Sequence, residues 1–367
     1  MVRGTAKHLI RLAAVSAVAS VAVLSAGSAA LADPVSSTVT VGKNTKVSNT
    51  ASTDQEKTTI ISFLTVRIDG KKTPVYCAEF GTPLADNQTY LEGDSDKSGI
   101  NKLGAISNLL AHAYPAVSAD DLIAAAGTSM PPASTDGHDI FDSPDFLAYV
   151  ATQAAIWELS NPDAFKFGDT WSSTLNVSKD QYAVIAAVHK YLGQFKTAVK
   201  PELTITPDTA TATVGGLAGP FTVTAKPGNP DVTLTATGGK AVDNEGHEVT
   251  TVKDGDQFWI TSDVVSPPAA TVHAEATFTI PAARVFFFGD GEKHGQKLVM
   301  GGTKHKKLTA DVTATFTPVP PSPSPTTPGL PVTGANVTGA AVGGAVLLLA
   351  GIGLVLVLRR RRVKFTA

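Results

Sequence analysis

The spacing of apolar positions changes character near residue 200. Before it, two alternating runs at 58–68 and 72–80 flank Asp69 and Gly70, a strong turn dipeptide, and predict a pair of strands. Runs with a helical period follow at 101–114, 118–127, 143–160 and 178–192. After residue 200, short Val/Thr/Ile-rich runs alternate with Gly, Pro and Asp, and no helical period remains. The pattern predicts an α+β domain over residues 33–200, with strands followed by helices, and an all-β immunoglobulin-like sandwich over 201–316.

Three of the expected helices carry start signals. Ser118 precedes Asp121 by three residues and Ser178 precedes Gln181 by three, so both serines are expected to cap a helix. Ser143 is followed by a proline at the first helical position, which also marks a helix start.

The N-terminal residues 1–32 have the composition of an export signal. Basic residues are followed by an apolar run that is too short to span a bilayer, and small residues stand at 30–32. We expect a secretory signal peptide, and therefore an exported chain.

The C-terminal residues 330–367 combine three features. Residues 339–358 form an uncharged apolar run which, at about 1.5 Å per residue, is long enough to cross a bilayer, and four arginines follow it. Before this transmembrane run stand Leu330, Pro331, Val332, Thr333 and Gly334. The order resembles the LPxTG sorting signal of Gram-positive surface proteins. The resemblance implies that a sortase cuts after Thr333 and joins it to peptidoglycan, so that the chain meets the membrane only transiently.

Residues 317–329 are rich in Pro, Ser and Thr, a composition that favours an extended spacer and cannot build a core. The charge is nearly balanced, with 30 Lys and Arg against 32 Asp and Glu. No basic patch argues for nucleic acid, and no His/Cys/carboxylate spacing predicts a metal or other cofactor. The Ala-, Val-, Thr- and Gly-heavy composition fits an actinobacterium-like source.

Cys77 is the single cysteine of the chain. Exported chains usually pair their cysteines, so an odd one suggests intermolecular pairing or a reactive thiol. Gln153 is also unusual, because it stands on an apolar stripe of the helix expected at 143–160. A buried amide is costly unless its hydrogen bonds are met, and the simplest interpretation is a core glutamine bonded to backbone.

The segment Thr152-Gln153-Ala154-Ala155 resembles the TQxA signature of bacterial thioester domains, and the run ending at Cys77 resembles the strand that carries their cysteine. The resemblance covers about residues 58–200. It implies an internal thioester between the sulfur of Cys77 and the side-chain carbonyl of Gln153, with the bond at the junction of a β part and a helical part. Water would hydrolyse such a bond, so Tyr76 and Trp157 are expected to shield it.

The resemblance implies a wall-anchored adhesin that is not an enzyme. Its partner would be an amine-bearing protein or surface, whose lysine takes the acyl group from sulfur. One alternative is an enzyme with Cys77 as nucleophile and His112, His138 or His189 as base. The other is a non-covalent surface-binding or wall-structural protein with an inert buried thiol.

Overall fold

The computed structural model describes residues 36–51, 57–84, 87–132, 143–266, 268–289 and 295–320. The expected signal peptide, the sorting signal and most of the spacer lie outside these residues. Among the described residues, no helix is both long and apolar enough to cross a bilayer.

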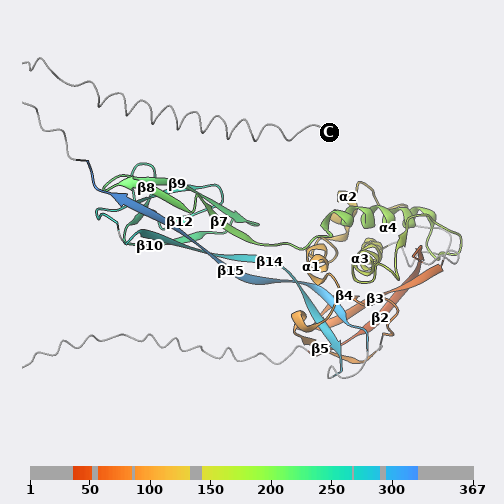
Figure 1. Ribbon diagram of the computed structural model, residues 1–367. Coiled ribbons are helices and arrows are strands. Elements are labelled where there is room, and N and C mark those ends of the chain that lie inside the picture. Colours follow the sequence, from red (N-terminus) through yellow and green to blue (C-terminus); the bar gives the residue numbers. More distant parts are fainter. Residues whose placement is uncertain are drawn as a thin grey trace, which may run out of the picture. The chain divides into compact units, whose positions relative to one another are not determined.

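The first sheet draws its strands from distant parts of the chain (Figure 1). Along its main path the order is β1, β5, β14, β15, β4, β3, β2, β6, and neighbouring strands are antiparallel. Asp69 and Gly70 join β3 to β4 with positive φ angles of 49° and 77°, as a type I′ hairpin turn requires, so the predicted strand pair is confirmed. The first six strands are β1 (Ser36–Thr38), β2 (Thr40–Asn49), β3 (Lys57–Ile68), β4 (Lys71–Cys77), β5 (Thr89–Gly93) and β6 (Phe167–Gly168).

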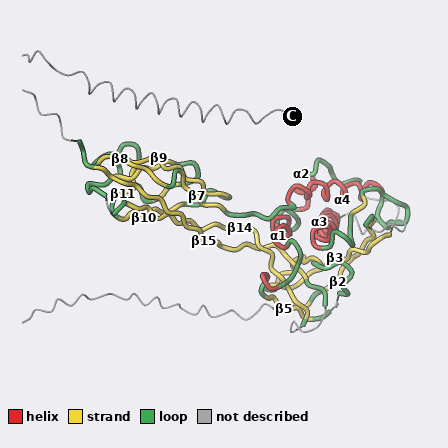
Figure 2. Tube along the Cα trace, viewed as in Figure 1, coloured by secondary structure: helices red, strands yellow, loops and turns green. Residues whose placement is uncertain are grey.

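Four α-helices lie where the helical period predicts them (Figure 2). Ser118 accepts a hydrogen bond from the Asp121 amide, and Ser178 forms a complete capping box with Gln181, as expected. Ser143 does precede the third helix, but its side chain makes no capping hydrogen bond. The helices are α1 (Leu103–Ala111), α2 (Ala119–Ala125), α3 (Pro144–Ser160) and α4 (Lys179–Leu192), with short 3₁₀ turns η1 (Ser95–Lys97) and η3 (Gly193–Phe195).

Helix α3 is the centre of the first core. It packs against the other three helices and against β3 and β4. Every residue from Phe146 to Trp157 is buried, so α3 is covered on all sides and has no solvent face. The apolar stripe expected from the sequence is therefore only part of what this helix buries.

A second core lies between two sheets in the later part of the chain. It contains the large buried side chains Phe221, Phe258 and Phe278, and it joins a four-stranded sheet ordered β11, β13, β9, β7 to the β10, β14 and β15 region of the first sheet. The two packed sheets agree with the predicted all-β sandwich. The strands are β7 (Glu202–Thr206), β8 (Thr209–Thr213), β9 (Ala218–Lys226), β10 (Val232–Thr237), β11 (Lys240–Val242), β12 (Thr251–Val252), β13 (Gln257–Thr261), β14 (Ala270–Phe288) and β15 (Leu298–Thr317).

The two long strands β14 and β15 serve both cores, which corrects the division expected at residue 200. Ala270–Ile280 of β14 belong to the second core, whereas Val285 and Phe286 are buried in the first. A bidentate ion pair from Arg284 to Glu92, at 2.7 and 2.6 Å, joins β14 to β5. Residues expected in the second domain therefore complete the first. There β14 pairs with β5 and β15 pairs with β4, both antiparallel.

Candidate functional site

The hairpin of β3 and β4 sets the register of the candidate site. Its ladder runs from the turn to the pair Leu64 and Val75 and stops there. Two residues further along each strand, the same register would place Ser62 opposite Cys77. Cys77 pairs instead with Leu298 of β15 on its other edge, and β3 continues alone with β2.

The hydroxyl of Tyr149 separates the two strands at this point. The Leu64 amide donates to the Tyr149 hydroxyl at 3.1 Å, and that hydroxyl donates to the Val75 carbonyl at 2.7 Å. Both strand groups would otherwise bond to each other across the ladder. A side chain from α3 thus replaces a direct strand–strand hydrogen bond and opens the space beyond it.

The side-chain amide of Gln153, one helical turn later on α3, takes the next ladder position. The Cys77 amide donates to Gln153 Oε1 at 2.8 Å, and Gln153 Nε2 donates to the Cys77 carbonyl at 2.9 Å. Gln153 is 1% exposed, so these two bonds compensate the desolvation of its amide. The structure brings Cys77 and Gln153 together across 76 residues of sequence, and Cys77 is a free cysteine in it.

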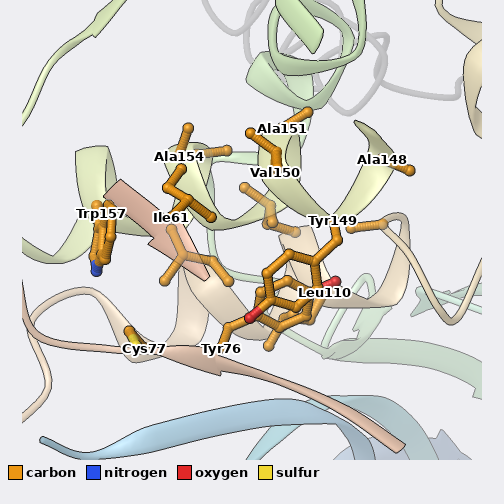
Figure 3. Packing of buried hydrophobic residues seen from close by; sticks show 14 of the residues in the cluster. Ile61, Tyr76, Cys77, Leu110, Ala148, Tyr149, Val150, Ala151, Ala154 and Trp157 are labelled. Atoms are coloured by element: carbon orange, nitrogen blue, oxygen red, sulfur yellow. The ribbon is translucent and has the colours of Figure 1, made fainter. Parts of the chain in front are cut away.

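A hollow of about 440 Å³ opens onto this pair. Trp157, one turn beyond Gln153, and Phe80 form an aromatic wall, with ring centroids 5.2 Å apart and an edge-to-face arrangement. Figure 3 shows Trp157 reaching down from α3 on the side of Cys77. The described residues that line the hollow carry no formal charge in their ordinary states; they are Thr58, Thr59, Ile60, Ser62, Leu64, Cys77, Phe80, Gly81, Thr82, Leu84, Gln153, Trp157 and Gln296.

Tyr76 does not line the hollow. Its ring stacks on Tyr149 with centroids 4.6 Å apart, and its hydroxyl donates to the Tyr114 carbonyl. In Figure 3 these two stacked rings lie on the opposite side of Cys77 from Trp157. Of the two residues expected to shield Cys77, Trp157 borders the hollow and Tyr76 supports the core beside it.

The environment of the thiol favours its neutral form. Burial raises the pKa of Cys77, and burial together with the nearby Cys77 and Tyr76 raises the pKa of Tyr149. Both groups therefore remain protonated at neutral pH. The Tyr149 hydroxyl can act as the donor to Val75, and the Cys77 sulfur is a weak nucleophile unless its target is held close to it.

The loop after Cys77 is bonded to Gln296 and Lys297, the two residues that precede β15. Lys297 Nζ and a Glu79 carboxylate oxygen lie 2.5 Å apart, and Gln296 Nε2 donates to the Glu79 carbonyl at 2.6 Å. The backbone amide of Gln296 also donates to the Pro83 carbonyl. This loop carries Phe80, so the segment that leads into β15 holds the aromatic wall in place.

The histidines considered as bases lie elsewhere or outside the described residues. His112 stacks on Phe195 with ring centroids 3.9 Å apart, and its Nδ1 lies 2.9 Å from the Asn108 carbonyl. His189 lies 3.2 Å from a carboxylate oxygen of Glu158. Neither lines the hollow, and His138 falls in a segment that the structure does not describe. In the described part of the chain, no cluster of His, Cys, Asp and Glu could hold a metal ion.

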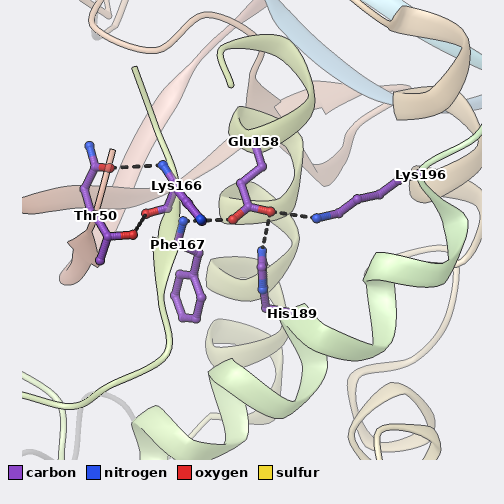
Figure 4. Close-up of polar contacts among 7 residues, drawn as sticks. Thr50, Glu158, Lys166, Phe167, His189 and Lys196 are labelled. Atoms are coloured by element: carbon purple, nitrogen blue, oxygen red, sulfur yellow. Dashed lines mark hydrogen bonds and ion pairs between the residues drawn. The ribbon is translucent and has the colours of Figure 1, made fainter. Parts of the chain in front are cut away.

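The group around Glu158 joins α3 to α4 and to Lys196, the residue that follows η3 (Figure 4). Lys196 Nζ lies 2.6 Å from Glu158 Oε2, and the Phe167 amide donates to Glu158 Oε1 at 2.9 Å. Burial opposes the charge of this carboxylate, but His189 and Lys196 together outweigh that effect and lower its pKa to about 2. Glu158 thus remains ionised and fixes the C-terminal part of the helix that carries Gln153.

Sequence reasoning missed Tyr149 and Phe80. Tyr149, Gln153 and Trp157 recur every four residues. This spacing places three side chains with hydrogen-bonding groups on one face of α3 and could have identified that face. Phe80 had no comparable signal, because its position depends on the loop and on β15.

Comparison with known proteins identifies one family for part of the chain. Residues 74–196 match the model of the family described as thioester domain, about a third of the chain. No curated protein matches the sequence.

Solved structures give the fold. The Bacillus anthracis TIE protein is 16% identical with a TM-score of 0.50, over 78% of this chain and 49% of that one, so the chain spans about half its length. The thioester domain of the Enterococcus faecium TIE86 protein is 20% identical with a TM-score of 0.44, over 78% of this chain and 98% of that one. The first likeness shows the fold of the Bacillus anthracis TIE protein. Together with the family match, it shows a thioester-domain fold, mostly strands with some helices.

Proposed function

We propose that this thioester-fold chain is a surface adhesin that captures its target covalently through a thioester between Cys77 and Gln153. The observation that carries the proposal is the paired hydrogen bonding of the Gln153 amide to the Cys77 backbone, beside a hollow with an aromatic wall. The thioester-domain match over residues 74–196 includes both residues and supports the same chemistry.

Bond formation balances as a condensation that releases ammonia. The sulfur attacks Gln153 Cδ, the bond from Cδ to Nε2 breaks, and the thiol proton leaves with the amino group as ammonia. Negative charge develops on Oε1 during the attack, and the Cys77 amide already donates to that atom at 2.8 Å. Since burial keeps the thiol protonated, the rate depends on how closely the strand and α3 hold the two groups.

Capture of the target is an acyl transfer. The neutral amine of a lysine attacks Cδ, the bond to sulfur breaks, and sulfur takes the proton that the amine loses. The products are an amide at Gln153 and a free thiol at Cys77. An uncharged lining disfavours the ammonium form and favours the neutral amine that reacts. The site is consumed in the reaction, so the chain is a single-use binder and not an enzyme.

The sequence at both ends suggests where this happens. Export by residues 1–32 would be followed by sortase cleavage after Thr333 and attachment of Thr333 to peptidoglycan. The span at 339–358 would then be a temporary stop, and the mature adhesin would stand on the cell wall through its short spacer. Deleting the sortase should release the chain from purified wall; unchanged attachment would contradict the anchoring part of the proposal.

Intact mass tests the thioester directly. The purified segment 33–316 should be one ammonia lighter than its sequence. Methylamine should then add once, at Gln153, which leaves the chain one CH2 group heavier than its sequence. Cys77→Ala should have its full sequence mass and take up no methylamine. A wild-type chain with full mass and a free thiol before any treatment would overturn the covalent mechanism and favour a non-covalent binder.

A further inference from the structure

The edge of β3 that faces the hollow is unpaired within the described part of the chain. Beyond Leu64, β3 pairs with β2 on one side, and no described residue pairs with residues 58–62 on the other. Thr58, Ile60 and Ser62 all line the hollow, and Ile60 is 58% exposed. An open strand edge beside a reactive pair is a template for another strand.

The direction of the β3 backbone groups follows from the strand period. The Leu64 amide points away from β2, to Tyr149, so the amide and carbonyl of Ser62 and Ile60 point the same way. Their partners on β2 agree with this assignment. The amides of Lys46 and Ser48, which lie opposite Ile60 and Thr58, donate away from β3, to Asn176 Oδ1 and the Tyr182 hydroxyl. Two successive donor and acceptor pairs of β3 thus face the hollow.

Among the described residues, a buried donor beside the same hollow also lacks an acceptor. Tyr149, Gln153 and Trp157 stand one turn apart on α3, and the polar groups of the first two bond to strand edges. Trp157 Nε1 is buried, with the residue 6% exposed, and finds no hydrogen-bond partner among the described residues. Because Nε1 is shielded from solvent, a backbone carbonyl of an added strand would satisfy it once the indole ring turns toward the hollow.

We propose that the target presents its lysine on an extended peptide segment that adds to the β3 edge along residues 58–62. Backbone groups of this segment pair with Ile60 and Ser62, and one of its carbonyls accepts from Trp157 Nε1. Its lysine side chain then points to α3 and reaches Gln153 Cδ. This inference rests on the proposed thioester and specifies the class of amine that it captures: a lysine in an unpaired or edge strand, rather than one on a helix.

Backbone-methylated peptides test the pairing with the unmodified protein. The probe is the peptide acetyl-Thr-Thr-Val-Lys-Val-Thr-Thr-amide, and adduct formation is followed by intact mass beside methylamine at equal concentration. One isomer carries N-methyl groups on the two residues that flank lysine, and the other on the two residues two positions from lysine. In a strand these sets point to opposite edges, so only one isomer loses the groups that face β3.

The expected pattern is a difference between the two isomers. The parent peptide should react at least about tenfold faster than methylamine, the gain expected from two net backbone hydrogen bonds. One isomer should fall to the methylamine rate, and the other should stay within about twofold of the parent. Equal rates for both isomers would overturn strand addition. A covalent adduct between two copies of the chain in place of the peptide adduct would also overturn it, because the occupant would then be the chain itself.

Three protein variants separate backbone pairing from a general loss of structure, and the readout is the ratio of peptide rate to methylamine rate. Ile60→Pro removes one amide that faces the hollow and should lower the ratio, whereas Ile60→Val keeps that amide and should retain it. Trp157→Phe keeps a ring but removes the donor, and should lower the ratio by about threefold to tenfold. Ratios that remain at the wild-type value in both Ile60→Pro and Trp157→Phe would contradict the inference. If methylamine itself fails to add to the wild type, the thioester proposal fails instead.

Discussion

Tyr149 and Gln153 lie one helical turn apart on α3, and their side chains replace two successive links of the β3–β4 ladder. The Tyr149 hydroxyl bridges the Leu64 amide and the Val75 carbonyl. The Gln153 side-chain amide hydrogen-bonds to both the backbone amide and the carbonyl of Cys77. The helix thus parts two strands that share a tight turn. The same separation gives Gln153 its position beside Cys77 and leaves the β3 edge without a pairing strand among the described residues.

Removing the Tyr149 hydroxyl should weaken the thioester as well as the fold. In Tyr149→Phe, Leu64 and Val75 can bond directly, which draws Ser62 toward Cys77 and sets it in competition with Gln153. We expect a loss of about 1–2 kcal/mol in the free energy of unfolding and a smaller fraction of chains with the ammonia deficit. Denaturant titration and intact mass measure the two effects.

Tyr182→Phe is the matched control. The Tyr182 hydroxyl likewise accepts from a strand amide, that of Ser48, and donates to a carbonyl on the neighbouring strand, that of Gly168. This bridge lies between β2 and β6, away from Cys77. A similar loss of stability with an undiminished ammonia deficit is expected. Equal deficits in both variants would show that the Tyr149 bridge does not position Gln153.

The local features of the fold could be predicted from the sequence. The Asp69–Gly70 turn, the four helices and the caps at Ser118 and Ser178 depend on residues within a few positions of each other. The return of β14 and β15 to the first core could not be predicted in the same way. Pairing between Cys77 and Leu298 joins positions more than two hundred residues apart, and nothing in either strand specifies its neighbour.

The site was predictable only in part, for a related reason. The proximity of Cys77 and Gln153 followed from a family resemblance, whereas the separation of β3 from β4 depends on how α3 packs. Tyr76 was expected to shield Cys77 because the two are adjacent in sequence. Neighbouring residues of a strand point to different sides, however, and the Tyr76 ring stacks on Tyr149.

The shared strands predict that the chain cannot be cut at residue 200. The segment 33–200 would lack Val285, Phe286, Leu298 and Val299, all fully buried in the first core. At about 1.5–3 kcal/mol for each buried side chain, their loss is comparable to the whole stability of a domain. We expect this segment to show no cooperative unfolding and no ammonia deficit, whereas 33–316 shows both. A folded segment 33–200 with the deficit would contradict the role given to β14 and β15.

The Glu158 cluster predicts a stability change at acid pH. The folded pKa of about 2 lies below the ordinary 4.5, so the carboxylate stabilises the fold above the ordinary value and loses this effect as the pH falls from about 4.5 to 2. Glu158→Gln should cost about 2–3 kcal/mol at pH 7, and its difference from wild type should shrink over that interval. Glu275→Gln, which breaks the surface pair with Lys307, should cost less than about 1 kcal/mol. Denaturant titrations at several pH values measure both, and a difference that does not change with pH would contradict the assignment.

The thiol released by methylamine should react slowly while the chain is folded. Burial raises the pKa of Cys77, and only the thiolate alkylates, so most of the sulfur is inert at neutral pH. Labelling of the methylamine-treated chain by iodoacetamide should rise about tenfold per pH unit from pH 7 to 10 without a plateau. The same chain in guanidinium should react much faster at pH 7 and level off near the ordinary thiol pKa of about 8.5. Untreated wild type should not label in either condition as long as the thioester is intact. If the folded, methylamine-treated chain levels off at the same pH as the unfolded one, the sulfur is solvated after capture. The hollow would then admit water to Cys77, and the aromatic wall of Phe80 and Trp157 could not account for protection of the thioester.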